Sequence, residues 1–210
     1  MASTPPSGMV GRIKAILTDP KSEFARIDAE PMTVSGIMTG WVVPLAAIGP
    51  LARLIGTMAF ASGGISIGGV TITAAPSTSY LVASAITQYI GAVIGAYVCA
   101  LIVSALAPTF GGQKDPVKAM KLVAYGGTAA YIASIFAIVP ALGLLAFLGL
   151  YSLYLFYVGL PVLMKSPEDK SIVYLIVIVI AYIVVMMVAG VLLGMASAVF
   201  APAPVVTIGN

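Results

Sequence analysis

Residues Asp115–Lys170 read DPVKAMKLVAYGGTAAYIASIFAIVPALGLLAFLGLYSLYLFYVGLPVLMKSPEDK, and this stretch decides the fold. Two apolar runs, Leu122–Val139 and Ala141–Met164, meet at Pro140, and charged residues close the stretch at both ends. Each run can cross a hydrocarbon core of about 30 Å as a helix that rises about 1.5 Å per residue. Because proline lacks a backbone donor and disfavours helix at the preceding residue, we expect the chain to turn back at Pro140. The stretch predicts a membrane hairpin with both open ends on one side.

The composition extends this prediction to the whole chain. Of the 210 residues, 60% are hydrophobic and only 8% are charged, whereas soluble domains carry about 25% charged residues. Backbone groups in lipid must find partners within their own segment, which favours helices. We therefore expect an all-α integral membrane protein with a cytoplasmic N-terminal segment at 1–33 and a membrane domain at 34–210. The five expected transmembrane helices are at about 34–60, 80–106, 122–139, 141–164 and 172–200.

The N-terminal segment carries the patterns of two short helices. Apolar residues recur at helical spacing within 9–17, with Arg12 and Lys14 on the other side, which is typical of an amphipathic helix on an anionic membrane surface. Asp19 and Pro20 fit the N-cap and the first position of a second short helix. Two roles stay open for these helices: they pack on the membrane domain, or they sense lipid.

The distribution of charge predicts the orientation. Nine of the ten Lys and Arg residues fall in segments that five spans place on one side, and the tenth, Arg53, falls within a span. Cytoplasmic segments are enriched in Lys and Arg, so we expect a cytoplasmic N-terminus, an exoplasmic C-terminus and a multi-pass protein of the cytoplasmic (inner) membrane. The cations that we expect to make cytoplasmic contacts are Arg12, Lys14, Lys114, Lys118, Lys121 and Lys165.

Several function classes lack the residues that they need. The chain has no histidine, the commonest general base, and all seven carboxylates lie outside the expected spans. Ion-coupled transporters generally need an ionisable group at membrane depth. The lack of a carboxylate in the expected spans weakens the hypothesis of coupled transport. No nucleotide-binding, hydrolase or redox motif occurs, and a net charge of +3 is too small to suggest nucleic-acid binding. We expect no catalytic residue, no cofactor and no metal site.

One candidate polar site lies within the spans. Arg53 lies roughly 28 Å along the first helix from Val34, where it can either snorkel into headgroups or meet Gln88 or Tyr89 of the second helix. Tyrosines also recur three residues apart on the fourth helix, where they can line a cavity or bond to neighbouring helices. The candidate intramembrane site comprises Arg53, Gln88, Tyr89, Tyr151 and Tyr154.

Glycines recur at a spacing of four in three spans. Such faces let helices approach closely, either within one chain or between two copies. We favour packing within the chain and leave a homo-oligomer open. The pairs are Gly36/Gly40, Gly91/Gly95 and Gly190/Gly194.

Short motifs in a fixed order give the chain a family resemblance. They are Pro20…Phe24…Ile27…Glu30-Pro31, Gly40…Pro44-Leu45, Lys118-Ala119-Met120-Lys121…Tyr125, Pro140, Leu150-Tyr151-Ser152-Leu153-Tyr154 and Gly159-Leu160-Pro161. From Arg12 to about Tyr182 the chain resembles the short bacterial branch of the Yip1-domain membrane proteins. It departs from the family pattern at Phe24, where Trp is frequent, and at Gly126-Gly127.

The resemblance implies five transmembrane helices and a cytoplasmic N-terminus. Eukaryotic relatives are membrane proteins of the early secretory pathway linked to Rab GTPases and vesicle traffic, and the family offers no catalytic residues to transfer. We expect a non-enzymatic protein of membrane organisation, a trafficking-type scaffold that contacts membrane lipids or a protein partner at its cytoplasmic face. The alternative is a small-molecule or lipid transporter or channel. An intramembrane enzyme has no specific support.

Overall fold

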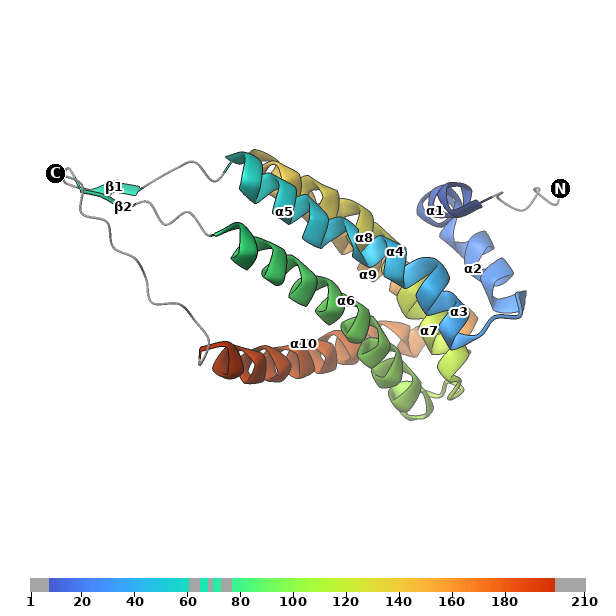
Figure 1. Cartoon of the computed structure of the whole chain (residues 1–210). Coiled ribbons are helices and arrows are strands. Elements are labelled where there is room, and N and C mark those ends of the chain that lie inside the picture. The colour runs from blue at the N-terminus through green and yellow to red at the C-terminus, as the bar shows by residue number, and fades with distance from the viewer. Residues whose placement is uncertain (1–7, 61–64, 68–69, 73–76, 199–210) are drawn as a thin grey trace.

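The structure, a computed structural model, describes residues 8–60, 65–67, 70–72 and 77–198 (Figure 1). Five helical segments among these residues are long and apolar enough to cross a membrane, which confirms the expected all-α membrane fold. The third and fifth segments begin earlier than expected, within the charged connections. The five spans are Val34–Phe60, Thr78–Phe110, Pro116–Ile138, Ala141–Leu163 and Glu168–Val191.

The N-terminal segment forms two short helices, α1 (Gly8–Thr18) and α2 (Pro20–Ala29). Asp19 caps α2, because its carboxylate accepts a hydrogen bond from the Ser22 amide, and Pro20 begins the helix, as the sequence predicts. Glu30 adopts extended torsions and ends α2.

Both short helices pack on the membrane domain through their apolar faces. Ile16, Phe24 and Ile27 have no exposed surface. The Phe24 ring lies against Gly159, where a Cβ would come within 3.1 Å of the ring. Of the two roles left open for these helices, the structure shows packing on the membrane domain. Lipid sensing stays a prediction, since Val10 of α1 is 79% exposed.

The first span changes its winding near Pro44. It consists of α3 (Val34–Ile37), a π-helical turn η1 (Met38–Val42), α4 (Val43–Ala46) and α5 (Ile48–Phe60). Proline lacks a donor and its ring clashes with the carbonyl four residues earlier, which here belongs to Gly40. The π turn at that position is one of the known ways in which a helix accommodates such a disruption.

A short hairpin follows α5, and the sequence patterns did not predict it. Strand β1 (Ile65–Ile67) pairs antiparallel with β2 (Val70–Ile72), with Ile65 opposite Ile72. The second span then runs as α6 (Thr78–Leu106) and a 3₁₀ turn η2 (Ala107–Phe110). Gly111 ends it in the left-handed region, where glycine adopts a positive φ at little cost.

The expected hairpin turns back at Val139 and Pro140. Its first arm is α7 (Pro116–Gly126), α8 (Thr128–Ala133) and η3 (Ser134–Ile138), and its second arm is η4 (Pro140–Leu150) and α9 (Tyr151–Leu163). Val139 is extended, which confirms the turn, but both arms wind as 3₁₀ helix next to it instead of the expected α-helix. This tighter winding places the carbonyls of Ala137 and Ile138 against Gly56 of α5.

The fifth span is part of α10 (Glu168–Ala198), which packs on α6 and α9 mainly through its first half. Tyr174 and Ile178 are buried there, whereas most of the later apolar side chains are exposed. Gly95 packs against Tyr182 and Met186 of α10, so this glycine serves contact within the chain. A Cβ at Gly40, Gly91 or Gly190 would meet no atom within 4 Å.

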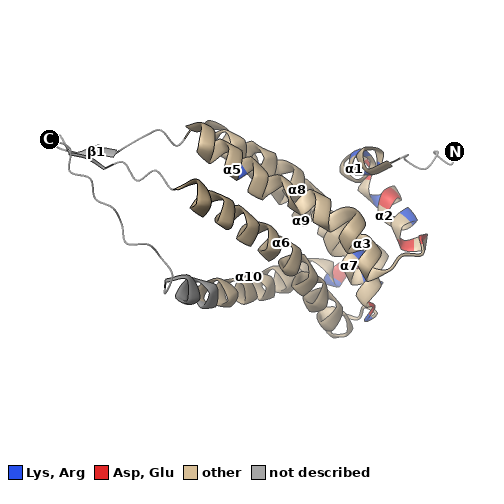
Figure 2. Ribbon diagram, viewed as in Figure 1, with Lys and Arg blue, Asp and Glu red and all other residues tan. Residues whose placement is uncertain are grey.

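Charged residues gather at one end of the helices (Figure 2). We call this the charged end, and it comprises residues 8–30 (α1, α2 and the residues next to them), 111–121 and 164–170. Arg53, on α5, is the one charged residue outside it among the described residues. The fully buried side chains Ile16, Phe24, Leu122, Leu155 and Leu160 join α1 and α2 to the membrane helices next to this end.

Candidate functional site

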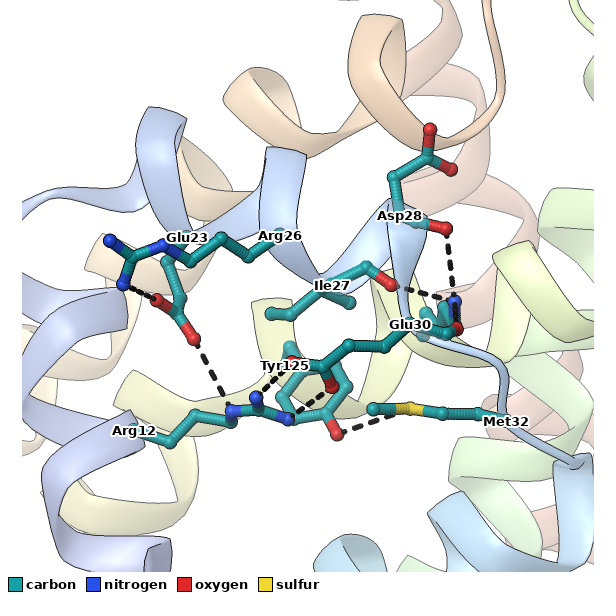
Figure 3. A network of polar contacts seen from close by, with 9 residues as sticks. Arg12, Glu23, Arg26, Ile27, Asp28, Glu30, Met32 and Tyr125 are labelled. Atoms are coloured by element: carbon teal, nitrogen blue, oxygen red, sulfur yellow. Dashed lines mark hydrogen bonds and ion pairs between the residues drawn. The ribbon is translucent and has the colours of Figure 1, made fainter. Parts of the chain in front are cut away.

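Arg12 is the centre of an ion-pair network between α1 and α2 (Figure 3). Its Nη1 donates to Glu30 Oε2 at 2.8 Å, and its Nη2 also contacts Glu30. Its Nε lies 3.3 Å from Glu23 Oε1, and the other oxygen of Glu23 lies 3.5 Å from Nη1 of Arg26. The Glu23 side chain is only 2% exposed. The two arginines therefore offset the cost of burying its carboxylate. The network fixes the angle between the two short helices.

The same arginine connects the network to the membrane helices. Its guanidinium carbon lies 5.8 Å from the ring centre of Tyr125 on α7, within cation–π range. Tyr125 in turn contacts Trp41 of η1, with ring centres 4.7 Å apart, and donates a hydrogen bond to Sδ of Met32. Burial lowers the pKa of Arg12, but hydrogen bonds with Glu30 and Tyr125 outweigh it and leave the pKa raised. The guanidinium therefore stays charged at any physiological pH.

A groove of about 590 Å³ runs beside these aromatic rings. Trp41 and Tyr125 form one wall, and Trp41 also donates a hydrogen bond to Thr128 at 3.2 Å, which fixes its ring. The remaining lining residues are Pro31, Met32, Thr33, Gly36, Ile37 and Gly40. The groove lies where α2 joins the first span, at the charged end.

Lys121 holds the last turn of α2 on α7. Its ammonium donates to the carbonyl oxygens of Ile27 and Glu30, both at 2.6 Å, and to that of Asp28 at 3.3 Å. These are carbonyls that a helix leaves without internal partners at its C-terminus, where the helix dipole also favours a cation. Lys121 is only 3% exposed. It therefore connects α7 to α2 inside the protein and does not act as a surface cation.

Asp28 joins three segments through its carboxylate. Lys118 of α7 lies 2.8 Å from one oxygen, and Lys165, which follows α9, lies 2.7 Å from the other. Burial raises the pKa of Asp28, but hydrogen bonds from the two lysines outweigh it and leave the pKa below its usual value. The carboxylate is therefore ionised throughout the physiological range.

These contacts change how the predicted cytoplasmic cations are interpreted. Arg12, Lys118, Lys121 and Lys165 all have partners within the chain, on or next to α2. Lys14 and Lys114 are exposed and make no ion pair with any described residue. The predicted set therefore divides into four residues that hold α2 in place and two that face outward.

Sequence reasoning missed the acidic partners and the aromatic wall. Glu23 and Glu30 are seven residues apart, two helical turns, and this spacing was an available sign that they face one direction. Trp41 and Tyr125 carried no such sign, because the two residues are brought together only by the packing of the first span on α7.

The candidate intramembrane residues do not converge on one site. Arg53 is exposed and has no hydrogen bond or ion pair with any described residue, and Gln88 bonds to the Ser84 carbonyl of its own helix at 3.2 Å. Tyr89 donates to the carbonyl of Val43 at 3.2 Å. The geometry thus contains no hydrogen bond between Arg53 and either predicted partner.

The two tyrosines of α9 lie at a different place from these three residues. Tyr151 donates to the Leu17 carbonyl of α1 at 3.1 Å and so helps to hold the N-terminal helices. The Tyr154 ring lies 5.3 Å from that of Tyr151, and Tyr154 is 46% exposed. Tyr151 therefore belongs to the docking of α1.

The described residues contain no group of three or more His, Cys, Asp or Glu side chains that could hold a metal ion. At the charged end, Arg12, Lys118, Lys121 and Lys165 form contacts that hold helices together. These contacts give the surface of the charged end a fixed shape.

Comparison with known families adds the decisive observation. The family model of the Yip1 domain matches residues 14–206. The chain belongs to the Yip1 domain family. The match covers α2 and all five spans, so the docked helix and the membrane helices form one family unit. No curated protein and no solved structure matches the chain.

Proposed function

We propose that this Yip1-domain protein is a non-enzymatic organiser of the cytoplasmic membrane, a scaffold that binds anionic lipid or an acidic protein partner at its charged end. The N-terminus and the charged end are cytoplasmic in this proposal, and the C-terminus is exoplasmic. Nine of the ten Lys and Arg residues support this orientation, because they lie on one side of the five spans. Family membership supports a membrane protein of this kind.

The observation that carries the proposal is the division of the cations at the charged end. Four cations hold α2 in place, which gives the end a fixed shape. Four others are exposed and form no ion pair with a described residue: Lys14, Lys21, Lys114 and Lys170. Lysines near an anionic leaflet each contribute about 1 kcal/mol to lipid binding. We assign the outward contacts to these four lysines.

The transporter alternative has less support. The groove between α5 and α6 that Tyr89 lines is apolar, and neither Arg53 nor Gln88 lines it. The carboxylates within the described spans are Glu168 and Asp169, which lie in the first turn of α10 at the charged end and not at membrane depth. A coupling ion would therefore lack its usual binding group.

Native mass spectrometry of the protein in patches of its own membrane tests the proposal. We expect the wild-type chain to carry a reproducible protein partner or a selected anionic lipid. The variant Lys14→Gln/Lys21→Gln/Lys114→Gln/Lys170→Gln should lose it. Arg53→Gln is the matched control, since it removes an exposed cation away from the charged end, and it should keep the partner. Equal retention by the quadruple variant would contradict the proposal. The same spectra report whether the chain is a homo-oligomer.

A further inference from the structure

A cavity of about 330 Å³ lies between α6, α7, α8, α9 and α10. It is about twice the size of an engineered apolar cavity that binds benzene. Small residues such as Ala92, Ala96 and Gly127 create the space, and no charged residue lines it. Ala130 and Leu153 line the cavity and are also exposed on the outer surface of the helices, so the cavity opens toward lipid.

Two of the tyrosines that line this cavity form no hydrogen bond with a described residue. Six tyrosines lie at least partly buried between helices, and four of them donate hydrogen bonds: Tyr89, Tyr125, Tyr151 and Tyr174. The other two, Tyr131 and Tyr182, have no hydrogen bond with any described residue, and both line this cavity. Tyrosine hydroxyls that lie between helices usually find a partner, and an unpaired polar group is costly in lipid. Both tyrosines without a hydrogen bond line the same cavity, which indicates that their acceptor belongs to a bound molecule.

The depth of the two hydroxyl-bearing residues limits what the acceptor can be. Tyr131 lies nine residues beyond Leu122 and Tyr182 ten beyond Ile172, where the two apolar runs begin, roughly 14–15 Å along each helix. That is near the middle of a bilayer whose hydrocarbon core is about 30 Å thick. Phospholipid ester groups lie at the interface, so they do not reach this depth. The acceptor must belong to a molecule that dissolves in the hydrocarbon core.

The lining also sets the charge and the hydrogen-bond type of the molecule. The Ser152 hydroxyl accepts a bond from the Ala130 amide, so its own hydrogen, like those of the two phenols, is a donor. A cavity with donors and no cation suits a neutral acceptor and gives no support to a carboxylate. We propose that this cavity binds a neutral, lipid-soluble carbonyl compound of the ketone or quinone type, whose oxygen accepts hydrogen bonds from Tyr131 and Tyr182.

The test uses 2-undecanone labelled with ¹³C at its carbonyl, added to the full chain in phospholipid bilayers. Infrared difference spectra separate the labelled carbonyl from lipid esters. We expect a component at lower wavenumber, typical of a hydrogen-bonded carbonyl, that saturates at about one ketone per chain. Tyr131→Phe/Tyr182→Phe removes only the two hydroxyls and should abolish this component. Tyr125→Phe, which removes a hydroxyl elsewhere, should retain it.

A second variant separates the cavity from the surrounding lipid. Ala92→Leu fills the cavity without touching a hydroxyl, and it should also abolish the saturable component. A wild-type chain without a saturable component would overturn the proposal. A component that persists in either the double phenylalanine variant or Ala92→Leu would overturn it as well, because the ketone would then be bound outside the cavity.

Discussion

Lys121 connects α7 to the last turn of α2 through three carbonyl oxygens. The sequence predicts that it lies on the cytoplasmic side and faces a partner. Its acceptors belong to the backbone more than ninety positions away, and every residue has such a carbonyl. No pattern in the sequence could mark these acceptors, so the internal role of Lys121 was not predictable.

Replacement of Lys121 by Met should release α2 from α7. Hydrogen bonds to a charged group contribute about 1.5–3 kcal/mol each, so we expect the docking of α2 to weaken by about 3 kcal/mol. Limited trypsin cleavage at Lys21 and Arg26, in bilayers, measures the release. Lys114→Met removes an exposed lysine of the same end and should leave cleavage slow. Slow cleavage of the Lys121 variant would contradict the assigned role.

Asp28 should make the charged end sensitive to acid. Its pKa is lowered in the folded chain by Lys118 and Lys165. The stabilisation is therefore complete above the ordinary aspartate pKa of about 3.9 and is lost as the pH falls through the lower folded value. Fluorescence of Trp41, the only tryptophan, should be constant from pH 7 to about 5 and change below pH 4. Asp28→Asn should show a smaller change below pH 4, and an equal change in both proteins would exclude Asp28 as its source.

Among the described glycines, Gly56 marks the tightest approach of two elements, the contact between α5 and η3. A Cβ at Gly56 would lie 2.3 Å from the carbonyl oxygen of Ile138, and backbone cannot move aside as a side chain can. Gly56→Ala should lower the unfolding free energy by about 1–3 kcal/mol. Gly91→Ala, on α6, adds a Cβ that meets no atom within 4 Å and is the control. Thermal unfolding in bilayers compares the two, and equal midpoints would rule out the close approach.

At the scale of elements, the sequence predicts the features that depend on a few neighbouring residues. Asp19 and Pro20 began α2 as expected, because a cap and a first-turn proline act within a few residues. The reversal at Pro140 was predicted for the same reason. The 3₁₀ winding of Ser134–Ile138 was not, because this segment packs against α5, which lies about eighty positions earlier. Pro140–Leu150, which is also 3₁₀, packs on α8 and on Ser134–Ile138. Strands β1 and β2 are three residues each, too short for alternation to stand out.

At the scale of the whole molecule, five spans and one charged end were predictable from hydropathy and charge alone. These signals persist over twenty or more residues and do not depend on how helices pack. The pairing within the charged end was not predictable, because it arises when α2 docks on α7 and α9. The residues of the candidate intramembrane site do not converge for a related reason. The sequence predicts a depth for each residue along its helix, but it does not predict the direction of the side chain.

The proposed orientation can be measured with single cysteines. In a Cys99→Ala chain, which should not react, cysteine replaces either Ser77 or Lys114. Both positions are exposed and lie at opposite ends of α6 and the loop that follows it. A membrane-impermeant maleimide should label Ser77→Cys in intact cells and Lys114→Cys only after the membrane is opened. The reverse pattern would place the charged end outside.

The docking of α1 and α2 on the membrane helices is the claim on which the fixed charged end depends. Hydrogen–deuterium exchange of the wild-type chain in phospholipid bilayers measures it directly. If the helices are docked, the amides of 22–29 exchange slowly, at rates comparable with those of Pro116–Gly126. Exchange as fast as that of the exposed Lys114 amide would show that α2 is not held by Lys121 and Asp28, and would contradict the structure-based assignment of the outward lysines.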